Sequence, residues 1–147
     1  MPTLEELLRA SLKGANEKID QANKDLHAAV VEAAKAVESV TEGKATLRLN
    51  ATGSDESGTR YDLDVIVYGG GNEARTLSNL GVPIKGYPIF RYTNRNRDST
   101  VERFDSVDAL KAYFQKLASD ADSPLVGYLA YVVRNPVEAS TSSEVPF

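Results

Sequence analysis

The stretch that decides the fold runs from Thr3 to Val40 and reads TLEELLRASLKGANEKIDQANKDLHAAVVEAAKAVESV. Thr3 followed by Glu6 three residues later matches a capping box, which marks the start of a helix. Apolar residues then recur every three or four positions, and no proline follows until Pro83. We therefore predict a single helix from about Thr3 to about Val40, ending near Gly43.

The apolar positions of this helix form a seam whose two halves differ. Polar flanks keep the first half narrow, which is typical of contact with one partner helix. From Val30 onward the apolar stripe widens through Ala34 and Val37, which favours burial against a sheet.

The predicted helix is also long for its chain. About 38 residues at ~1.5 Å each give ~57 Å, whereas a compact chain of this length has a radius of gyration of only ~15 Å. Such a helix must overhang its own domain, bend back at Gly14 or Asn23, or pack against another chain. We favour the last alternative and expect the protein to act as an oligomer. The residues assigned to this oligomer interface are Leu8, Leu12, Ala15, Ile19, Ala22 and Leu26.

Alternating patterns predict strands after the helix. We expect strands over 44–52 and 60–68, joined by a long loop over 53–59, and further strands over 89–93 and 100–104. Residues 75–89 are ambiguous, because Pro83 and Pro88 argue against a central strand there. A second helix is expected from Asp105 or Ser106 to Ser119, and the apolar run 125–133 is interpreted as a central strand.

This order of elements predicts a two-layer α+β fold. A long N-terminal helix and one shorter helix would pack on a mainly antiparallel sheet of four to five strands. We expect residues 1–42 to form the long helix, residues 43–134 to form the α+β body of the same single domain, and the Ser/Thr/Pro/Glu-rich tail 135–147 to be disordered.

Composition excludes several kinds of site. The chain has 147 residues, a net charge of −4, no cysteine and one histidine, His27, so neither a disulfide nor a thiolate or multi-histidine metal site is expected. No apolar run approaches the ~20 residues that span a bilayer, and charges interrupt the N-terminus where a signal peptide would be apolar. We expect a cytoplasmic protein with no membrane partner, no metal and no cofactor.

The triple glycine Gly69–Gly71 formally matches a dinucleotide-binding fingerprint, since Ala74 follows at the required spacing after a strand. The segment 72–80 is too short for the crossover helix of such a site, and Pro83 interrupts it. A turn or bulge is favoured, and an anion-binding loop with Arg75 nearby is the alternative.

The segment from Lys85 to Arg103 carries five basic and two acidic residues in an otherwise acidic chain. Arginines supply bidentate phosphate contacts, aromatic rings supply stacking surfaces and amides can read base edges. The pattern indicates a surface for a nucleotide or a short single-stranded nucleic acid; the alternative is a polar hairpin whose rings belong to the core. The candidate ligand-binding residues are Arg75, Lys85, Tyr87, Arg91, Tyr92, Asn94, Arg95, Asn96, Arg97 and Arg103.

Carboxylates offer a third kind of site. Asp62 and Asp64 are two residues apart on a predicted strand and so share a face, where they could bind a metal or act as an acid and base. Alternation places that face on the solvent side, opposite Tyr61 and Leu63, so a solvated pair is the favoured interpretation.

These observations favour a non-enzymatic, self-associating binding protein that takes a phosphate-bearing ligand. The alternative is a protein-interaction module, such as an adaptor, inhibitor or immunity-type protein of a phage or mobile element, acting through the helix seam or a sheet edge. An enzyme that uses Asp62 and Asp64, or the glycine loop, is a third hypothesis. No catalytic residue is assigned.

Overall fold

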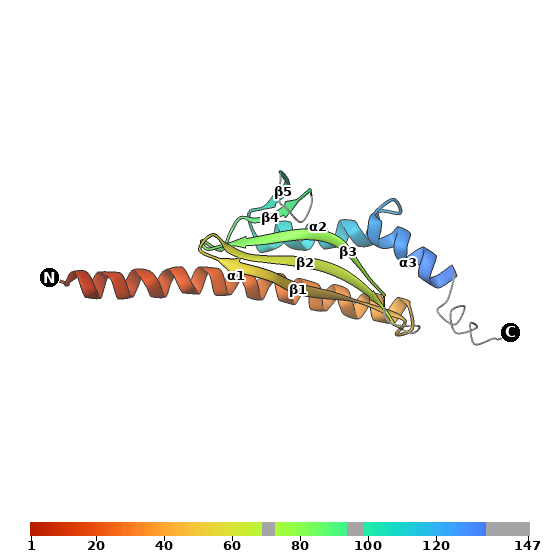
Figure 1. Cartoon of the computed structure of the whole chain (residues 1–147), viewed down its shortest axis with the longest axis horizontal. Coiled ribbons are helices and arrows are strands. Elements are labelled where there is room, and N and C mark those ends of the chain that lie inside the picture. The colour runs from red at the N-terminus through yellow and green to blue at the C-terminus, as the bar shows by residue number, and fades with distance from the viewer. Residues whose placement is uncertain (69–72, 94–98, 135–147) are drawn as a thin grey trace.

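The computed structural model describes residues 1–68, 73–93 and 99–134. Along the chain its elements are α1 (Leu4–Val40), β1 (Ala45–Asp55), β2 (Gly58–Val67), β3 (Glu73–Pro83), β4 (Ile89–Tyr92), β5 (Thr100–Phe104), α2 (Val107–Ser119) and α3 (Pro124–Arg134). The five strands form one antiparallel sheet in the order β1-β2-β3-β4-β5. The predicted two-layer α+β fold is confirmed, with the long helix under the sheet (Figure 1).

Helix α1 begins where its sequence predicts. The Thr3 hydroxyl accepts a hydrogen bond from the Glu6 amide at 3.1 Å, and the Glu6 carboxylate accepts one from the Thr3 amide at 3.0 Å. This closed capping box satisfies two amides that the first turn of a helix otherwise leaves without partners. The hydrogen bond from the Thr3 amide lowers the pKa of Glu6, so the cap stays ionised under ordinary conditions.

The β1–β2 hairpin is tighter than predicted. Both strands extend into the expected loop, which leaves only Glu56 and Ser57 as the connection. The Asp55 carboxylate accepts hydrogen bonds from the hydroxyl and amide of Ser57 at 2.6 and 2.9 Å, and these bonds lower the pKa of Asp55 to about 2. Gly58 follows with a φ of +138°, where an added Cβ would lie 2.1 Å from the Val82 carbonyl oxygen. The polar composition of residues 53–59 predicted a long loop, but this segment forms two strand ends joined by a two-residue turn.

Strand β3 corrects the prediction for residues 75–89. It is the central strand of the sheet, although it contains a proline. Pro83 is tolerated because it is the last residue of β3, where the ladder ends, and the amide of the next residue, Ile84, donates to the Ser57 carbonyl at 3.0 Å.

Helix α3 corrects the prediction of a strand over 125–133. The Ser123 hydroxyl accepts from the Val126 amide at 3.1 Å, and Pro124 occupies the first helical position, so the chain enters a helix. Leu125, Tyr128 and Val132 are buried at helical spacing. An apolar run of this length does not distinguish helix from strand by periodicity, and the Ser-Pro start signal was overlooked.

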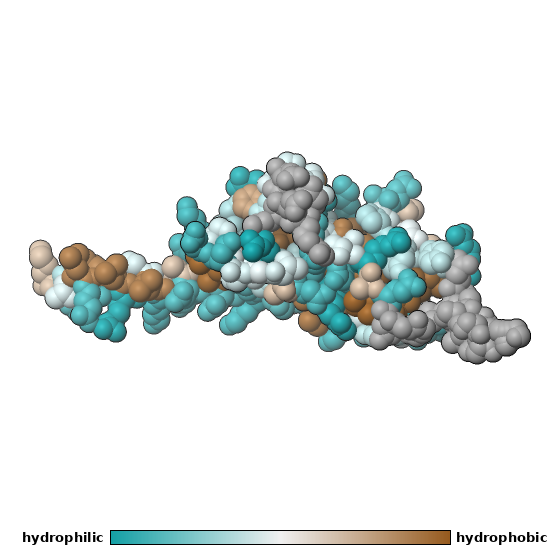
Figure 2. All heavy atoms as spheres, in the orientation of Figure 1, coloured by the Kyte–Doolittle hydropathy of each residue, from teal (hydrophilic) through white to brown (hydrophobic). Residues whose placement is uncertain are grey.

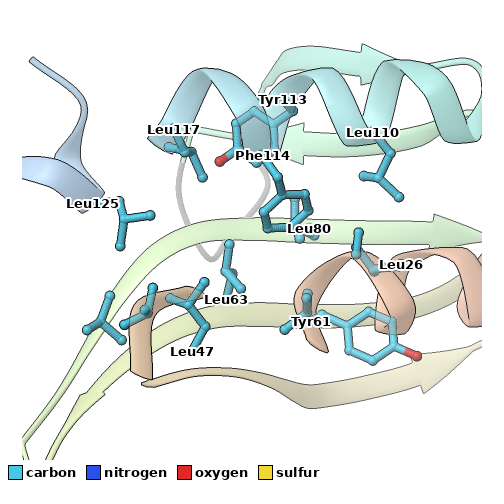
Figure 3. Packing of buried hydrophobic residues seen from close by; sticks show 14 of the residues in the cluster. Leu26, Leu47, Tyr61, Leu63, Leu80, Leu110, Tyr113, Phe114, Leu117 and Leu125 are labelled. Atoms are coloured by element: carbon cyan, nitrogen blue, oxygen red, sulfur yellow. The ribbon is translucent and has the colours of Figure 1, made fainter. Parts of the chain in front are cut away.

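The core lies between the sheet and the helices (Figure 3). The largest fully buried side chains come from both layers: Leu26, Leu63, Leu80, Ile89, Phe104 and Leu110. Helix α2 contributes Leu110, Phe114 and Leu117 at helical spacing, and Ser106 caps it by accepting from the Ala109 amide at 3.3 Å.

Candidate functional site

The first part of α1 projects beyond the sheet that covers its second part (Figure 1). The body reaches the helix where Gly86 packs on it, so closely that an added Cβ would lie 2.6 Å from the Lys18 carbonyl oxygen. Two hydrogen bonds then join the body to the helix. The Tyr61 hydroxyl donates to Asn23 at 2.6 Å, and the Tyr87 hydroxyl donates to Asp25 at 2.7 Å. About 14 residues precede Lys18 in the helix, so the projection is ~21 Å long at ~1.5 Å per residue.

The projection carries an apolar surface, which we call the leucine stripe. Its members are Leu4, Leu7, Leu8 and Leu12, whose exposed fractions are 79%, 51%, 62% and 61%. Figure 2 shows this patch as a brown surface at the N-terminal end of the molecule. Single exposed leucines are ordinary, but four on one side of a projecting helix form a contiguous patch typical of an interaction surface.

The predicted oligomer interface divides where the body begins. Leu8, Leu12 and Ala15 are exposed, and Ile19 is partly buried. Ala22 and Leu26 are both 0% exposed, because the sheet and the 84–88 loop region of the same chain cover them. Assigning these two residues to an intermolecular seam was therefore wrong.

A second apolar surface lies at the opposite end of α1. The three helices enclose a groove of about 670 Å³ on the body. One wall is α1, where Ala29, Ala33 and Ala36 leave a low surface, and the others are α2 and α3. The full lining is Ala29, Glu32, Ala33, Ala36, Val37, Val40, Lys111, Phe114, Gln115, Ala118, Leu125, Val126, Leu129, Ala130 and Val133. Only Glu32, Lys111 and Gln115 among these are polar, so the groove suits an apolar occupant.

The predicted ligand-binding residues on β4 and β5 do not share one face. Because alternate residues of a strand point to opposite sides, Arg91 and Tyr92 face different ways. Arg91 lies on the helix side, with its guanidinium 5.5 Å from the ring centroid of Tyr113, and donates twice to Glu102 at 3.1 and 3.2 Å. Arg103 donates to Asp105 at 2.9 and 3.1 Å. Both arginines thus already pair with carboxylates.

The other candidates of this set are scattered. The guanidinium of Arg75 lies 4.5 Å from the ring centroid of Tyr128 in α3, and Lys85 is exposed. Tyr87 is held against α1 by Asp25, and this burial and hydrogen bond raise its pKa. Asn94, Arg95, Asn96 and Arg97 lie outside the described residues, as does the glycine loop 69–72. Binding of a phosphate-bearing ligand remains a prediction that depends on 94–97.

The carboxylates of β2 correct a prediction. Asp62 and Asp64 do lie on the sheet face opposite the core, but they are only 4% and 9% exposed rather than solvated. Asp64 accepts from Asn50 at 2.6 Å and from Thr76 at 2.7 Å, and Asp62 accepts from Asn79 at 2.8 Å. Side chains of the two flanking strands close over them, so the pair reads as a structural hydrogen-bonded network.

A small polar hollow between β3, β5 and α2 was not foreseen. It measures about 210 Å³ and contains Ser78, which is hydrogen-bonded to the Tyr113 hydroxyl, beside Arg91 and Glu102. Burial raises the pKa of Tyr113, so its hydroxyl stays protonated at neutral pH. The position of Tyr113 three residues after Leu110 places it on the same face of α2, and this spacing is the sequence signal that indicates its burial.

Other kinds of site find no support in the described part of the chain. Within residues 1–68, 73–93 and 99–134, no three His, Asp or Glu side chains come together as metal ligands. No helix in those same ranges combines the length and the apolar character that crossing a bilayer requires. Comparison with models of known families, with curated proteins and with solved structures finds no match to this chain.

Proposed function

We propose that this protein is a self-associating assembly module whose projecting N-terminal helix binds a second copy of the chain. The observation that carries the proposal is the leucine stripe on a helix segment that no other element of the described residues covers. The capping box stabilises the projecting segment as a helix from its first turn, so that the four leucines lie on one side of it.

The energetics favour covering this surface. Fully burying one leucine side chain contributes ~1.5–3 kcal/mol, and the stripe exposes the equivalent of about two and a half such side chains. Transfer of the stripe from water to an apolar partner therefore contributes ~4–7 kcal/mol per copy before the entropic cost of association. An exposed apolar surface of this kind also promotes non-specific aggregation. A specific partner that covers the stripe prevents this and gives the molecule a defined oligomeric state.

The test is the oligomeric state of matched variants, measured by sedimentation velocity and light scattering. Leu8→Gln/Leu12→Gln removes half of the stripe and keeps helix propensity, because leucine and glutamine are both good helix formers. Lys13→Gln/Glu17→Gln is the control, since both residues are exposed on the side of α1 away from the stripe and the net charge is unchanged.

We expect wild type and control to self-associate at micromolar concentrations and the leucine variant to be monomeric. Wild type that stays monomeric at several hundred micromolar, or a leucine variant that associates as wild type does, would refute the proposal.

A further inference from the structure

The leucine stripe alone is too small to hold two copies together. At ~25 cal/mol per Å² its four leucines bury only ~150–300 Å² per copy, so two stripes facing each other bury ~300–600 Å². Stable protein interfaces bury about 1,200–2,000 Å² in total. The stripe therefore needs a partner surface that surrounds it rather than another stripe.

The groove between α1, α2 and α3 has that shape. We infer that the leucine stripe of one copy docks in the three-helix groove of a second copy, an inference that rests on the proposed self-association. Three walls contact a docked helix on several sides, and each copy offers both a stripe and a groove. Two copies that exchange stripes form a closed pair with two such contacts, consistent with the two-fold symmetry that most soluble oligomers adopt.

The two surfaces fit in length and relief. The stripe spans Leu4 to Leu12 and is ~12 Å long at ~1.5 Å per residue, so it fits within the α1 wall of the groove, which spans Ala29 to Val40 and is ~17 Å long. Leucines form high ridges, whereas the alanines of the groove wall leave low positions that allow close approach of a second helix. Val40 is 68% exposed at the end of this wall, so the groove leaves apolar surface to be covered.

Charge does not oppose the docking. The groove has one acid, Glu32, and one base, Lys111, among its lining residues. The stripe is flanked by Glu5 and Arg9, which pair with each other at 2.6 Å. Neither surface carries an excess of one sign, so no like-charge repulsion arises when they meet.

The stripe cannot reach the groove of its own chain. Both lie on the same unbroken helix, and the 28 residues from Leu8 to Ala36 separate them by ~42 Å. A leucine stripe that fills the groove must therefore come from a second copy of the chain.

The experiment uses a groove variant of the full chain. Ala36→Gln/Ala130→Gln places long side chains in the groove from α1 and α3, at positions that are exposed in the single chain. Ala28→Gln/Ala112→Gln is the control, since both alanines are exposed on α1 and α2 outside the groove. We expect the groove variant to raise the dimer dissociation constant about tenfold or more, because overpacked positions oppose docking, and the control to leave it unchanged. Thermal melts check that both variants fold.

Complementation then gives the deciding result. The variant Leu8→Gln/Leu12→Gln keeps an intact groove, and the groove variant keeps an intact stripe, so an equimolar mixture can form one good contact. We expect the mixture to associate more strongly than either variant alone and to give a heterodimer, identified by its mass in native mass spectrometry. Groove variants that dimerise as wild type does, or a mixture that associates no more strongly than either variant alone, would overturn the inference while wild-type dimers still support self-association. Monomeric wild type would instead overturn the proposed function.

Discussion

A leucine-to-alanine substitution should lower the free energy of unfolding by different amounts in the two halves of α1. Leu26 is 0% exposed and packs in the core with Tyr61 and Leu80 (Figure 3). Leu8, in contrast, is 62% exposed on the projection. Truncating a buried leucine to alanine costs ~2–5 kcal/mol, because transfer energy is lost and a cavity remains. A chain of this size loses ~3 °C of melting temperature per kcal/mol, so Leu26→Ala should melt ~6–15 °C lower.

For Leu8→Ala, we expect the free energy of unfolding to change by less than ~0.5 kcal/mol in dilute solution. The Leu8 side chain is already exposed to water in the folded monomer, and alanine is at least as good a helix former as leucine. The measurement is urea unfolding followed by circular dichroism at low micromolar concentration. The same unfolding series at a hundredfold higher concentration reports association: wild type should gain stability there, and Leu8→Ala should gain less.

Either of two results refutes this reasoning. A cost below ~1 kcal/mol for Leu26→Ala would mean that the second half of α1 does not belong to the core. A cost for Leu8→Ala equal to that of Leu26→Ala, independent of concentration, would mean that the projection packs within its own chain.

Two further predictions concern polar groups. Tyr87→Phe removes the hydrogen bond to Asp25 and should cost ~1 kcal/mol at pH 8, measured by urea unfolding. Because burial and Asp25 raise the folded-state pKa of Tyr87, its protonated form contributes stability that is complete below pH ~10 and is lost as the pH rises through the folded-state value. The difference in free energy of unfolding between wild type and Tyr87→Phe should accordingly decrease above pH ~10. A difference that stays constant up to pH ~11.5 would contradict this. Asp64→Asn should cost ~1–3 kcal/mol, since one of the donors Asn50 and Thr76 then meets an amide nitrogen; a neutral effect would show that the network does not stabilise the sheet.

Local signals explain which elements were predictable. The capping box at Thr3 and the repeat of apolar residues act within a few residues of each other, so the helix could be read directly. Strands β4 and β5 were found from alternation between turn residues. Strand β3 is not predictable from local signals, because only the sheet shows that Pro83 is the last residue of the strand. Helix α3 is ambiguous in the sequence, because an apolar run of this length fits either a helix or a strand.

The candidate sites were less predictable, because they depend on what lies beside each residue. Alternation correctly assigned Asp62 and Asp64 to the face opposite the core, but only the neighbouring strands show that they are buried. The arginines of the 85–103 segment looked like one surface, yet Arg91 and Arg103 bind different carboxylates on different sides of the sheet.

The long helix shows the same division. Its sequence alone determined that it forms, where it starts and that it is longer than a domain of this size requires, because helix formation and capping depend on residues within one or two turns. Tertiary structure decided which apolar residues are covered: Ala22 and Leu26 lie under the sheet, and Leu8 and Leu12 do not. It alone also created the groove, since α1, α2 and α3 come from distant parts of the chain and meet only when the sheet brings them together.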